Sequence, residues 1–291
     1  MRLLLWMSFS FFTWLSFAQS TGSLKESLTM DSKILGNPVK YSIYLPAGYE
    51  TSQRRYPVLF LLHGYTDNET GWTQFGEVNR IADREMMDHG VTPMIIAMPD
   101  AGLDWYVNSF DGKTRYEDFF VEEFIPFIES NYQARGTKEF RAIAGLSMGG
   151  HGTLIYAFKY PHLFAAAAPL SAAAWTEEDI LDIPQKDWQQ YFGFIFGEST
   201  GPEDRINDHI RENMAYYLAR DGNVDSLKQV RYYIDCGDDD FLINGNMELH
   251  RILLEKGVPH EFRVRDGVHD WTYWRTALPE VLKFVSESFH R

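Results

Sequence analysis

Short apolar segments and amphipathic stretches alternate along this chain of 291 residues. Apolar or alternating runs bounded by proline and glycine are typical of strands, and they lie at 39–45, 58–62, 94–98, 140–144, 163–170, 230–236 and 260–264. Segments with a helical pattern occur among these runs, at 116–132, 151–160, 246–256 and 271–289. This alternation predicts an α/β fold with a mostly parallel central sheet and helices on both of its faces.

The segment 116–132 carries apolar residues at Phe120, Phe124 and Phe127 with acidic residues between them, which predicts an amphipathic helix. Pro126 lies inside this segment. Proline removes a backbone donor and clashes with the preceding turn, so we expect the helix to bend there.

The segment 172–224 interrupts the alternation of strands and helices. It is acidic and irregular, and it contains Trp175, Pro184, Trp188 and Pro202. A plain connection between a strand and a helix is much shorter. We interpret the segment as a cap or lid over the functional site; the alternative is a surface excursion with two short helices.

Composition narrows the class of protein. The chain is 45% hydrophobic and 15% aromatic, which suits one large packed domain, predicted over 22–291. The formal net charge is −14, and such a surface repels nucleic-acid backbones and anionic lipid, so we expect neither as a partner. The single cysteine, Cys236, excludes an intramolecular disulfide and lies by an apolar run that predicts a buried, inert thiol.

The first eighteen residues have the pattern of a secretory signal peptide. Arg2 precedes an apolar and aromatic stretch at 3–17, and Ser16-Phe17-Ala18 offers small residues at the positions that signal peptidase reads. We predict cleavage before Gln19 and an exported protein, periplasmic or extracellular, with no membrane attachment after cleavage. An uncleaved anchor is the alternative, but the stretch is short for a membrane span.

The pentapeptide Gly145-Leu146-Ser147-Met148-Gly149 has the G-x-S-x-G pattern of a nucleophile elbow. The five letters alone are weak evidence, because a glycine-rich turn with a solvent-facing serine has the same pattern. The context favours the elbow, since a predicted strand precedes the motif and a predicted helix follows it. Ser147 then lies at a helix N-terminus, where N–H groups and the helix dipole stabilise developing negative charge.

A serine nucleophile needs a base and an orienting acid, and in this type of arrangement the acid comes before the histidine in the chain. His269 is the best-placed base, because it lies in the loop after the predicted strand 260–264. The loop after strand 230–236 carries Asp238, Asp239 and Asp240 in succession. Any of the three suits the orienting role by position. Three adjacent acids also raise the alternative of a hard-cation site, but they lack the alternating spacing of calcium ligands.

Four segments together resemble the esterase D/feruloyl esterase branch of the α/β-hydrolases, which includes the feruloyl and acetyl xylan esterases of carbohydrate esterase family 1. They are the sequence LLHGY at 61–65, GLSMGG at 145–150, DCGDDDFL at 235–242 and GVHDW at 267–271. The similarity covers nearly all of the chain after the predicted signal peptide. It implies an α/β-hydrolase fold for one catalytic domain over 22–291, with 172–224 as its cap.

The resemblance implies a role for each candidate catalytic side chain. Ser147 attacks the ester carbonyl, and His269 accepts its proton and later donates it to the leaving alcohol. Asp240, directly before the Phe-Leu pair, orients the imidazole. Asp238 and Asp239 stand where the family more usually has threonine and glutamate.

The oxyanion hole implied by the resemblance consists of main-chain groups. The N–H groups of Tyr65 and Met148 are expected to hold the developing oxyanion. His63 is expected to have a structural role at the end of its strand. This chemistry calls for no cofactor and no metal.

Aromatic residues near these motifs are candidates for an aryl or sugar platform, with burial in the core as the alternative for each. The substrate-binding candidates are Trp105, Trp271 and Trp274. Together with export, the resemblance implies an esterase that removes feruloyl or acetyl groups from xylan. Its partner is then an ester-bearing plant polysaccharide or oligosaccharide, or a small aryl ester. The alternatives are a thioesterase like S-formylglutathione hydrolase, an acyltransferase like the mycolyltransferases, and a non-catalytic binding protein on the same fold.

Overall fold

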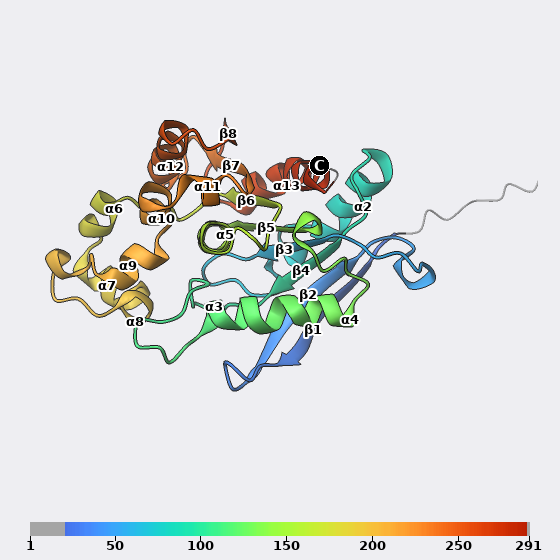
Figure 1. The fold of residues 1–291 in the computed structure, drawn as a ribbon, viewed down its shortest axis with the longest axis horizontal. Helices are drawn as coiled ribbons and strands as arrows, with labels where there is room; N and C mark the ends of the chain where they lie inside the picture. The colour runs from blue at the N-terminus through green and yellow to red at the C-terminus, as the bar shows by residue number, and fades with distance from the viewer. Residues whose placement is uncertain (1–20, 290–291) are drawn as a thin grey trace, which may run out of the picture.

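The computed structural model describes residues 21–289, so the predicted signal peptide lies outside the described residues. An eight-stranded sheet runs through the molecule in the order β1-β2-β4-β3-β5-β6-β7-β8 (Figure 1). β1 pairs antiparallel with β2, and β2 pairs antiparallel with β4, whereas all other neighbours are parallel. The predicted mostly parallel sheet is therefore confirmed. The strands are β1 (Ser23–Asp31), β2 (Pro38–Leu45), β3 (Val58–Leu62), β4 (Ile95–Pro99), β5 (Arg141–Leu146), β6 (Ala166–Leu170), β7 (Arg231–Gly237) and β8 (His260–Arg265).

Helices cover both faces of the sheet, because each central strand sends alternate side chains to opposite sides. In β3, Val58, Phe60 and Leu62 lie in one core and Leu59 and Leu61 in the other. Strands buried on both faces are near-continuous apolar runs. This pattern is what predicted them from the sequence. The first core is covered by α4 (Ile125–Asn131), α5 (Met148–Lys159), α10 (Ala215–Asp221) and α12 (Ile243–Glu255), and the second by α2 (Val78–Asp88) and α13 (Trp271–Ser288).

The predicted helix over 116–132 is continuous, but its middle is π-helical. α3 (Tyr116–Asp118) leads into a π-helical segment at Phe119–Phe124, and α4 follows directly. Pro126 lies in the first turn of α4. A proline clashes with the carbonyl four residues earlier, which here belongs to the widened π-helical segment. The structure thus accommodates Pro126 by a change of helical type immediately before it.

The segment 172–224 contains more structure than the two short helices of the surface-excursion alternative. Figure 1 shows α6 to α9 gathered at one end of the molecule, beside α10 and α12. Trp188 and Phe196 are buried among these helices, so the segment has apolar contacts of its own. Its elements are α6 (Glu177–Asp182), α7 (Gln185–Tyr191), α8 (Gly193–Phe196), a 3₁₀ turn (Pro202–Asp204), α9 (Asp208–Asn213) and α10.

Two elements near the N-terminus were not predicted. β1 is an edge strand with mostly exposed residues, and α2 has several charged residues and begins after Glu77, which has a left-handed backbone with φ of 52°. Neither carries the apolar run or the capping residue by which such elements are found. The remaining short elements are 3₁₀ turns at Tyr49–Thr51 and Lys138–Phe140 and the helices α1 (Gly71–Gln74) and α11 (Val224–Leu227).

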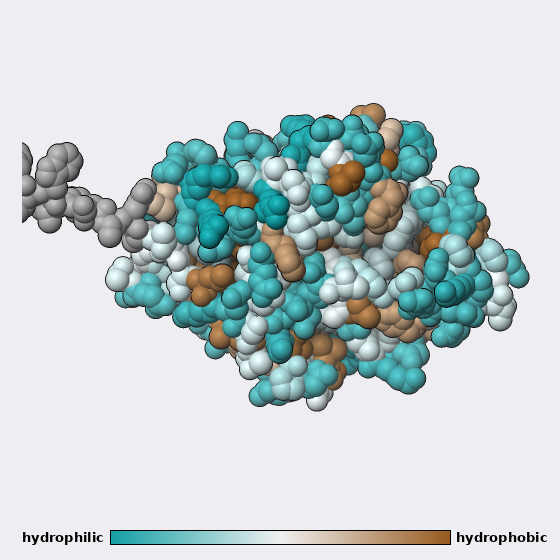
Figure 2. All heavy atoms as spheres, turned by 180° about the vertical axis from the view of Figure 1, so that it is seen from behind, coloured by the Kyte–Doolittle hydropathy of each residue, from teal (hydrophilic) through white to brown (hydrophobic). Residues whose placement is uncertain are grey.

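The face of the molecule shown in Figure 2 is largely polar. On the face shown in Figure 2, apolar residues form small separate patches among hydrophilic ones. None of the helices within residues 21–289 is long and apolar enough to cross a bilayer. Cys236 is buried as predicted, and this burial raises the pKa of its thiol far above the usual value.

Candidate active site

Ser147 lies in a strained turn between β5 and α5. Its backbone has φ of 54° and ψ of −114°, a conformation that side-chain-bearing residues rarely adopt and that costs about 1–3 kcal/mol. The N–H of Ser147 donates to the carbonyl of Leu170 at 2.9 Å, and this hydrogen bond holds the turn in place. A Cβ on Gly149 would lie 2.5 Å from the carbonyl oxygen of Leu62, so only glycine lets α5 approach β3 this closely.

Three of the predicted side chains come together at this turn. His269 Nε2 lies 2.9 Å from Ser147 Oγ, and His269 Nδ1 lies 2.8 Å and 3.0 Å from the two carboxylate oxygens of Asp240. Because a carboxylate only accepts, Nδ1 carries the ring proton and Nε2 is left to accept from the serine hydroxyl. This is the arrangement in which a neutral imidazole can act as base toward a serine.

Asp240 is the acid that meets His269 among the three adjacent aspartates. It is 2% exposed. Burial alone would raise its pKa, but hydrogen bonds from His269 and from the N–H of Leu242 outweigh burial and lower the pKa below its usual value. Asp238 and Asp239 are exposed on the loop surface. Within residues 21–289 no group of His, Cys, Asp or Glu side chains is arranged to hold a metal ion.

The His269 ring lies between two aromatic side chains. Phe241 contacts it at 4.5 Å between ring centroids and is itself 73% exposed. Trp274 meets it edge-on at 4.9 Å and is 6% exposed, with its indole N–H donating to Ser171 Oγ. Trp274 therefore supports the imidazole from the core, while Phe241 covers it on the solvent side.

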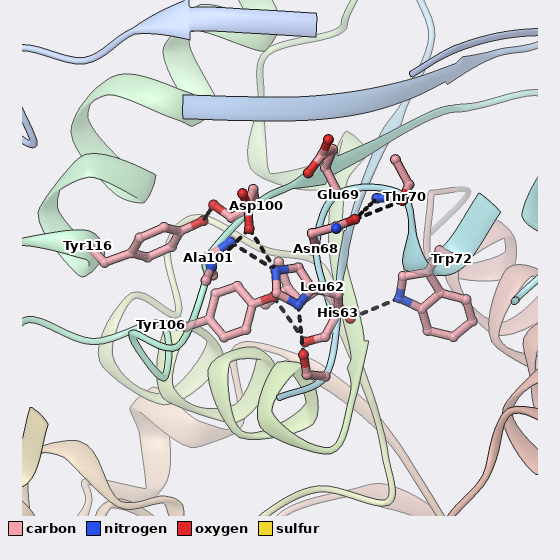
Figure 3. A network of polar contacts seen from close by, with 12 residues as sticks. Leu62, His63, Asn68, Glu69, Thr70, Trp72, Asp100, Ala101, Tyr106 and Tyr116 are labelled. Carbon is pink, nitrogen blue, oxygen red and sulfur yellow. Dashed lines mark hydrogen bonds and ion pairs between the residues drawn. The ribbon is translucent and has the colours of Figure 1, made fainter. Parts of the chain in front are cut away.

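His63 holds the loop after β3 in place, as Figure 3 shows. Its Nδ1–H donates to the carbonyl of Gly64 at 2.8 Å, and its Nε2 accepts from the N–H of Ala101 at 2.9 Å. Its own carbonyl accepts from the Tyr106 hydroxyl at 3.0 Å. Both ring nitrogens are used within the protein and the side chain is buried, which is the structural role expected for His63.

The two expected oxyanion donors border this loop and the elbow. Met148 begins α5, where the first N–H groups have no helical acceptor. Neither the Tyr65 N–H nor the Met148 N–H donates a hydrogen bond within the part of the chain that the structure describes. Gly64 packs against the serine, since a Cβ on it would lie 3.6 Å from Ser147 Cβ. Neither N–H group is therefore committed to another acceptor within residues 21–289.

The three candidate substrate-binding tryptophans do not form one platform. Trp105 is buried against segment 172–224, 5.1 Å from Trp175, and lies 5.6 Å from Tyr65 between ring centroids. Trp271 packs against Trp274 at 5.3 Å in a separate cluster. Packing thus accounts for Trp105 and Trp274, and only Trp271 is partly exposed.

A groove of about 230 Å³ lies between the start of segment 172–224 and the residues that follow Asp240. Neither Ser147 nor His269 lines it, but Phe241, which contacts the His269 ring, does. Trp175 and Phe241 are its large apolar side chains. Sequence reasoning did not assign the groove, because it is formed by two segments far apart in the chain. Its lining comprises Ala174, Trp175, Asp179, Asp182, Ile183, Phe241, Leu242, Asn244 and Gly245.

Comparison with known protein families and curated proteins gives consistent matches. A family model named Esterase, described as "Putative esterase", matches residues 32–285. An esterase of Mycobacterium tuberculosis is 29% identical over 248 residues, which is 78% of this chain and 52% of that protein. An endo-1,4-beta-xylanase/feruloyl esterase of Xylanibacter ruminicola is 34% identical over 206 residues, 68% of this chain and 28% of that protein. The chain spans about half or less of the length of these relatives.

Solved structures give the same picture. A ferulic acid esterase superposes with a TM-score of 0.79 at 32% identity, covering 93% of this chain and 99% of that one. Among the curated proteins, S-formylglutathione hydrolases also match the chain. The one from Bos taurus is 24% identical over 289 residues, which is 87% of this chain and 89% of that protein.

Proposed function

The chain belongs to the esterase family, with the α/β-hydrolase fold of its solved relatives, and we propose that it hydrolyses carboxylic esters through an acyl-enzyme on Ser147. The hydrogen-bonded series from Ser147 through His269 to Asp240, at 2.9 Å and 2.8 Å, carries this proposal. A serine, a neutral imidazole and a buried carboxylate in this order are the groups that nucleophilic acyl transfer requires.

The proposed reaction has two halves. Ser147 Oγ attacks the ester carbonyl while His269 Nε2 takes its proton, and the N–H groups of Tyr65 and Met148 hold the oxyanion. The imidazolium then gives this proton to the leaving alcohol, and the acyl group stays on the serine. Water repeats the sequence, releasing the acid and the free serine. Asp240 remains ionised throughout and stabilises the imidazolium.

We propose that the leaving alcohol is a sugar hydroxyl and the acyl group feruloyl or acetyl, as on xylan. The leaving alcohol must lie near His269, because it receives its proton from that ring. The groove borders Phe241, which contacts the His269 ring, and it combines the aromatic faces of Trp175 and Phe241 with the polar side chain of Asn244. Apolar faces with a few polar groups suit a sugar ring. The matches to feruloyl esterases agree with this substrate class.

A thioesterase acting on S-formylglutathione is the second candidate, since hydrolases of that name match the chain. The acidic lining of the groove argues against this candidate. Asp179 and Asp182 line the groove proposed for the leaving group, and glutathione carries two carboxylates at neutral pH. Repulsion between these aspartates and the carboxylates of glutathione disfavours binding of the thioester.

A comparison of substrates tests both candidates. We expect kcat/KM for methyl ferulate or for acetylated xylo-oligosaccharides to exceed that for S-formylglutathione at least tenfold, with every activity lost in Ser147→Ala. Preference for methyl ferulate would assign the acyl group as feruloyl, and preference for the acetylated oligosaccharide as acetyl. A higher kcat/KM for S-formylglutathione would overturn the sugar ester in favour of the thioester. Activity that persists in Ser147→Ala would overturn the mechanism.

We also propose that the protein is exported with cleavage before Gln19. The support is the apolar stretch and the small residues that precede this position. Expression of the full chain in a bacterial host, followed by N-terminal sequencing of the exported fraction, should give a chain that begins Gln-Ser-Thr-Gly. Retention of Met1 in the cytosolic fraction alone would contradict it.

A further inference from the structure

Asp235 is a fully buried carboxylate that the proposed reaction does not use. It lies on β7, five residues before Asp240. Arg265 binds it with two nitrogens, at 2.9 Å and 3.1 Å. The hydroxyl of Tyr233 donates to it at 2.8 Å, and the hydroxyl of Tyr273 donates to its other oxygen. Each carboxylate oxygen therefore accepts two hydrogen bonds.

Two of these partners stand at the two ends of the loop that carries His269. Arg265 is the last residue of β8, four residues before the histidine, and Tyr273 lies in the first turn of α13, four residues after it. The Arg265 guanidinium also lies 4.6 Å from the centre of the Tyr273 ring. One buried carboxylate on β7 thus holds both ends of the histidine loop.

A second set of contacts joins this loop to the loop of Asp240. The carboxylate of Asp238 accepts from the N–H of Gly267 at 3.0 Å, and the N–H of Asp239 donates to the carbonyl of Gly267 at 3.1 Å. The N–H of Asp238 donates to the carbonyl of Arg265 at 3.0 Å. The acid and the base of the site are therefore carried by two loops that are hydrogen-bonded to each other.

The histidine loop has little packing of its own. Val268, next to the histidine, is 47% exposed, and Asp266 is exposed as well. Besides the ring contacts of His269 and the hydrogen bonds at Gly267, the loop is held by the contacts at its two ends. Reacting groups lose about 100-fold in rate when they are misplaced by about 1 Å. A buried ion pair, in contrast, adds little to stability over an apolar replacement, so its position is the property that needs an explanation.

We propose that Asp235, with Arg265 and Tyr273, is a positioning unit that keeps His269 within hydrogen-bond distance of both Ser147 and Asp240. Asp238 provides a second tie through Gly267. The proposal rests on the proposed function, because that function makes His269 the base of the reaction. The geometry that it explains, two loops anchored on one carboxylate, is independent of any substrate.

Two tyrosines provide a matched test. The hydroxyls of Tyr233 and Tyr273 donate to the same carboxylate, and both residues are 4% exposed. Only Tyr273 is connected to the histidine loop. We expect Tyr233→Phe and Tyr273→Phe to lower Tm by similar amounts. Tyr273→Phe should also lower kcat about tenfold at unchanged KM, whereas Tyr233→Phe should change kcat less than twofold. Equal kcat values in the two variants would overturn the proposal.

The adjacent aspartates provide a second matched pair. Asp238→Ala removes the acceptor of the Gly267 N–H, whereas Asp239→Ala removes an exposed carboxylate with no hydrogen bond in the described chain. We expect kcat to fall about threefold to tenfold in Asp238→Ala and to stay within twofold in Asp239→Ala. The reverse order would contradict the second tie.

A readout without substrate separates this proposal from the proposed function. In protein labelled with ¹⁵N-histidine, the Nδ1–H of His269 reports its hydrogen bond to Asp240. We expect this NMR signal to shift or broaden in Tyr273→Phe and to match wild type in Tyr233→Phe. That result would hold even if no ester were hydrolysed, which would refute only the proposed function. An unchanged signal in Tyr273→Phe would refute the positioning unit.

Discussion

At the scale of single residues, the site depends on which of three neighbouring carboxylates reaches His269. Asp240 is buried, accepts from both His269 and the N–H of Leu242, and has a pKa held below its usual value despite burial. Asp239 next to it is exposed. The two residues differ by one position in the chain and entirely in environment, so they can be compared directly.

We predict that Asp240→Asn lowers kcat by about 10³–10⁴-fold, because the amide NH2 can donate to Nδ1 and so favours the wrong imidazole tautomer, and because a neutral amide no longer stabilises the imidazolium. The matched Asp239→Asn should retain kcat within twofold. Steady-state kinetics on a soluble aryl ester measure both. A similar loss of kcat in the two variants would show that catalysis depends on the integrity of the loop and not on the carboxylate of Asp240.

Asp104 gives a prediction about pH. Burial and the neighbouring Asp100 raise the pKa of Asp104 to about 6. A carboxyl with a raised pKa in the folded state stabilises the fold when protonated, and this stability is lost as pH rises from about 4 to about 6. Asp104→Asn should therefore raise Tm by about 2 °C at pH 7.5 and leave it unchanged near pH 3.5. Thermal melts at the two pH values test this, and an equal shift at both would contradict it.

The sequence located the chemically active side chains better than it located their surroundings. Ser147 and His269 follow predicted strands in a fixed order, so local motifs were sufficient to place them. The burial of Trp105 and the four hydrogen bonds that three residues make to the Asp235 carboxylate arise from segments far apart in the chain. One sequence alone holds no local signal for such contacts.

At the scale of elements, burial decides what the sequence reveals. β3 and β5 were predicted closely, because both of their faces are covered and, apart from Arg141 at the start of β5, every residue is apolar or small. The edge strand β1 alternates weakly, and its exposure removed the signal. The segment 172–224 was recognised as a departure from the alternation of strands and helices. Its individual short helices were not predicted, since they depend on helix-capping residues and on one buried arginine.

That arginine, Arg205, is 1% exposed and donates to the carbonyls of Ile180, Leu181 and Ile183 at the end of α6. These carbonyls have no helical partners. We predict that Arg205→Met costs about 2–3 kcal/mol locally and raises amide exchange over 177–191 at least tenfold, while β3 and β5 keep wild-type protection. Hydrogen–deuterium exchange with mass spectrometry measures this.

The control for the cap is Lys186→Met, which removes an exposed positive charge from α7 in the same segment. Its exchange should match that of wild type. If Arg205→Met increased exchange evenly across the molecule, the cap would be part of one cooperative unit with the sheet, and our interpretation of Arg205 as its local anchor would be wrong.

At the scale of the whole molecule, charge selects among substrates. The chain has a formal charge of −14, and Asp179 and Asp182 line the groove that Phe241 borders. Such a field repels anionic ligands over distances of about a Debye length, which is ~10 Å at 0.1 M salt. Uncharged esters do not experience this repulsion.

We therefore predict that KM for an ester with a carboxylate on its alcohol side falls severalfold as ionic strength rises from about 20 mM to about 0.5 M. KM for the matched methyl ester of that carboxylate should change less than twofold. A salt series with the two esters measures the difference. Identical salt dependence for both would show that the acidic groove does not contribute to selectivity.

The central claim is that Ser147 is a nucleophile activated by His269, and its most direct test is covalent labelling with a fluorophosphonate followed by peptide mass spectrometry. We predict a single adduct on Ser147 in the wild type, no adduct in Ser147→Ala, and labelling slowed at least 10³-fold in His269→Ala. An unlabelled wild-type protein, or an adduct on another residue, would contradict the account.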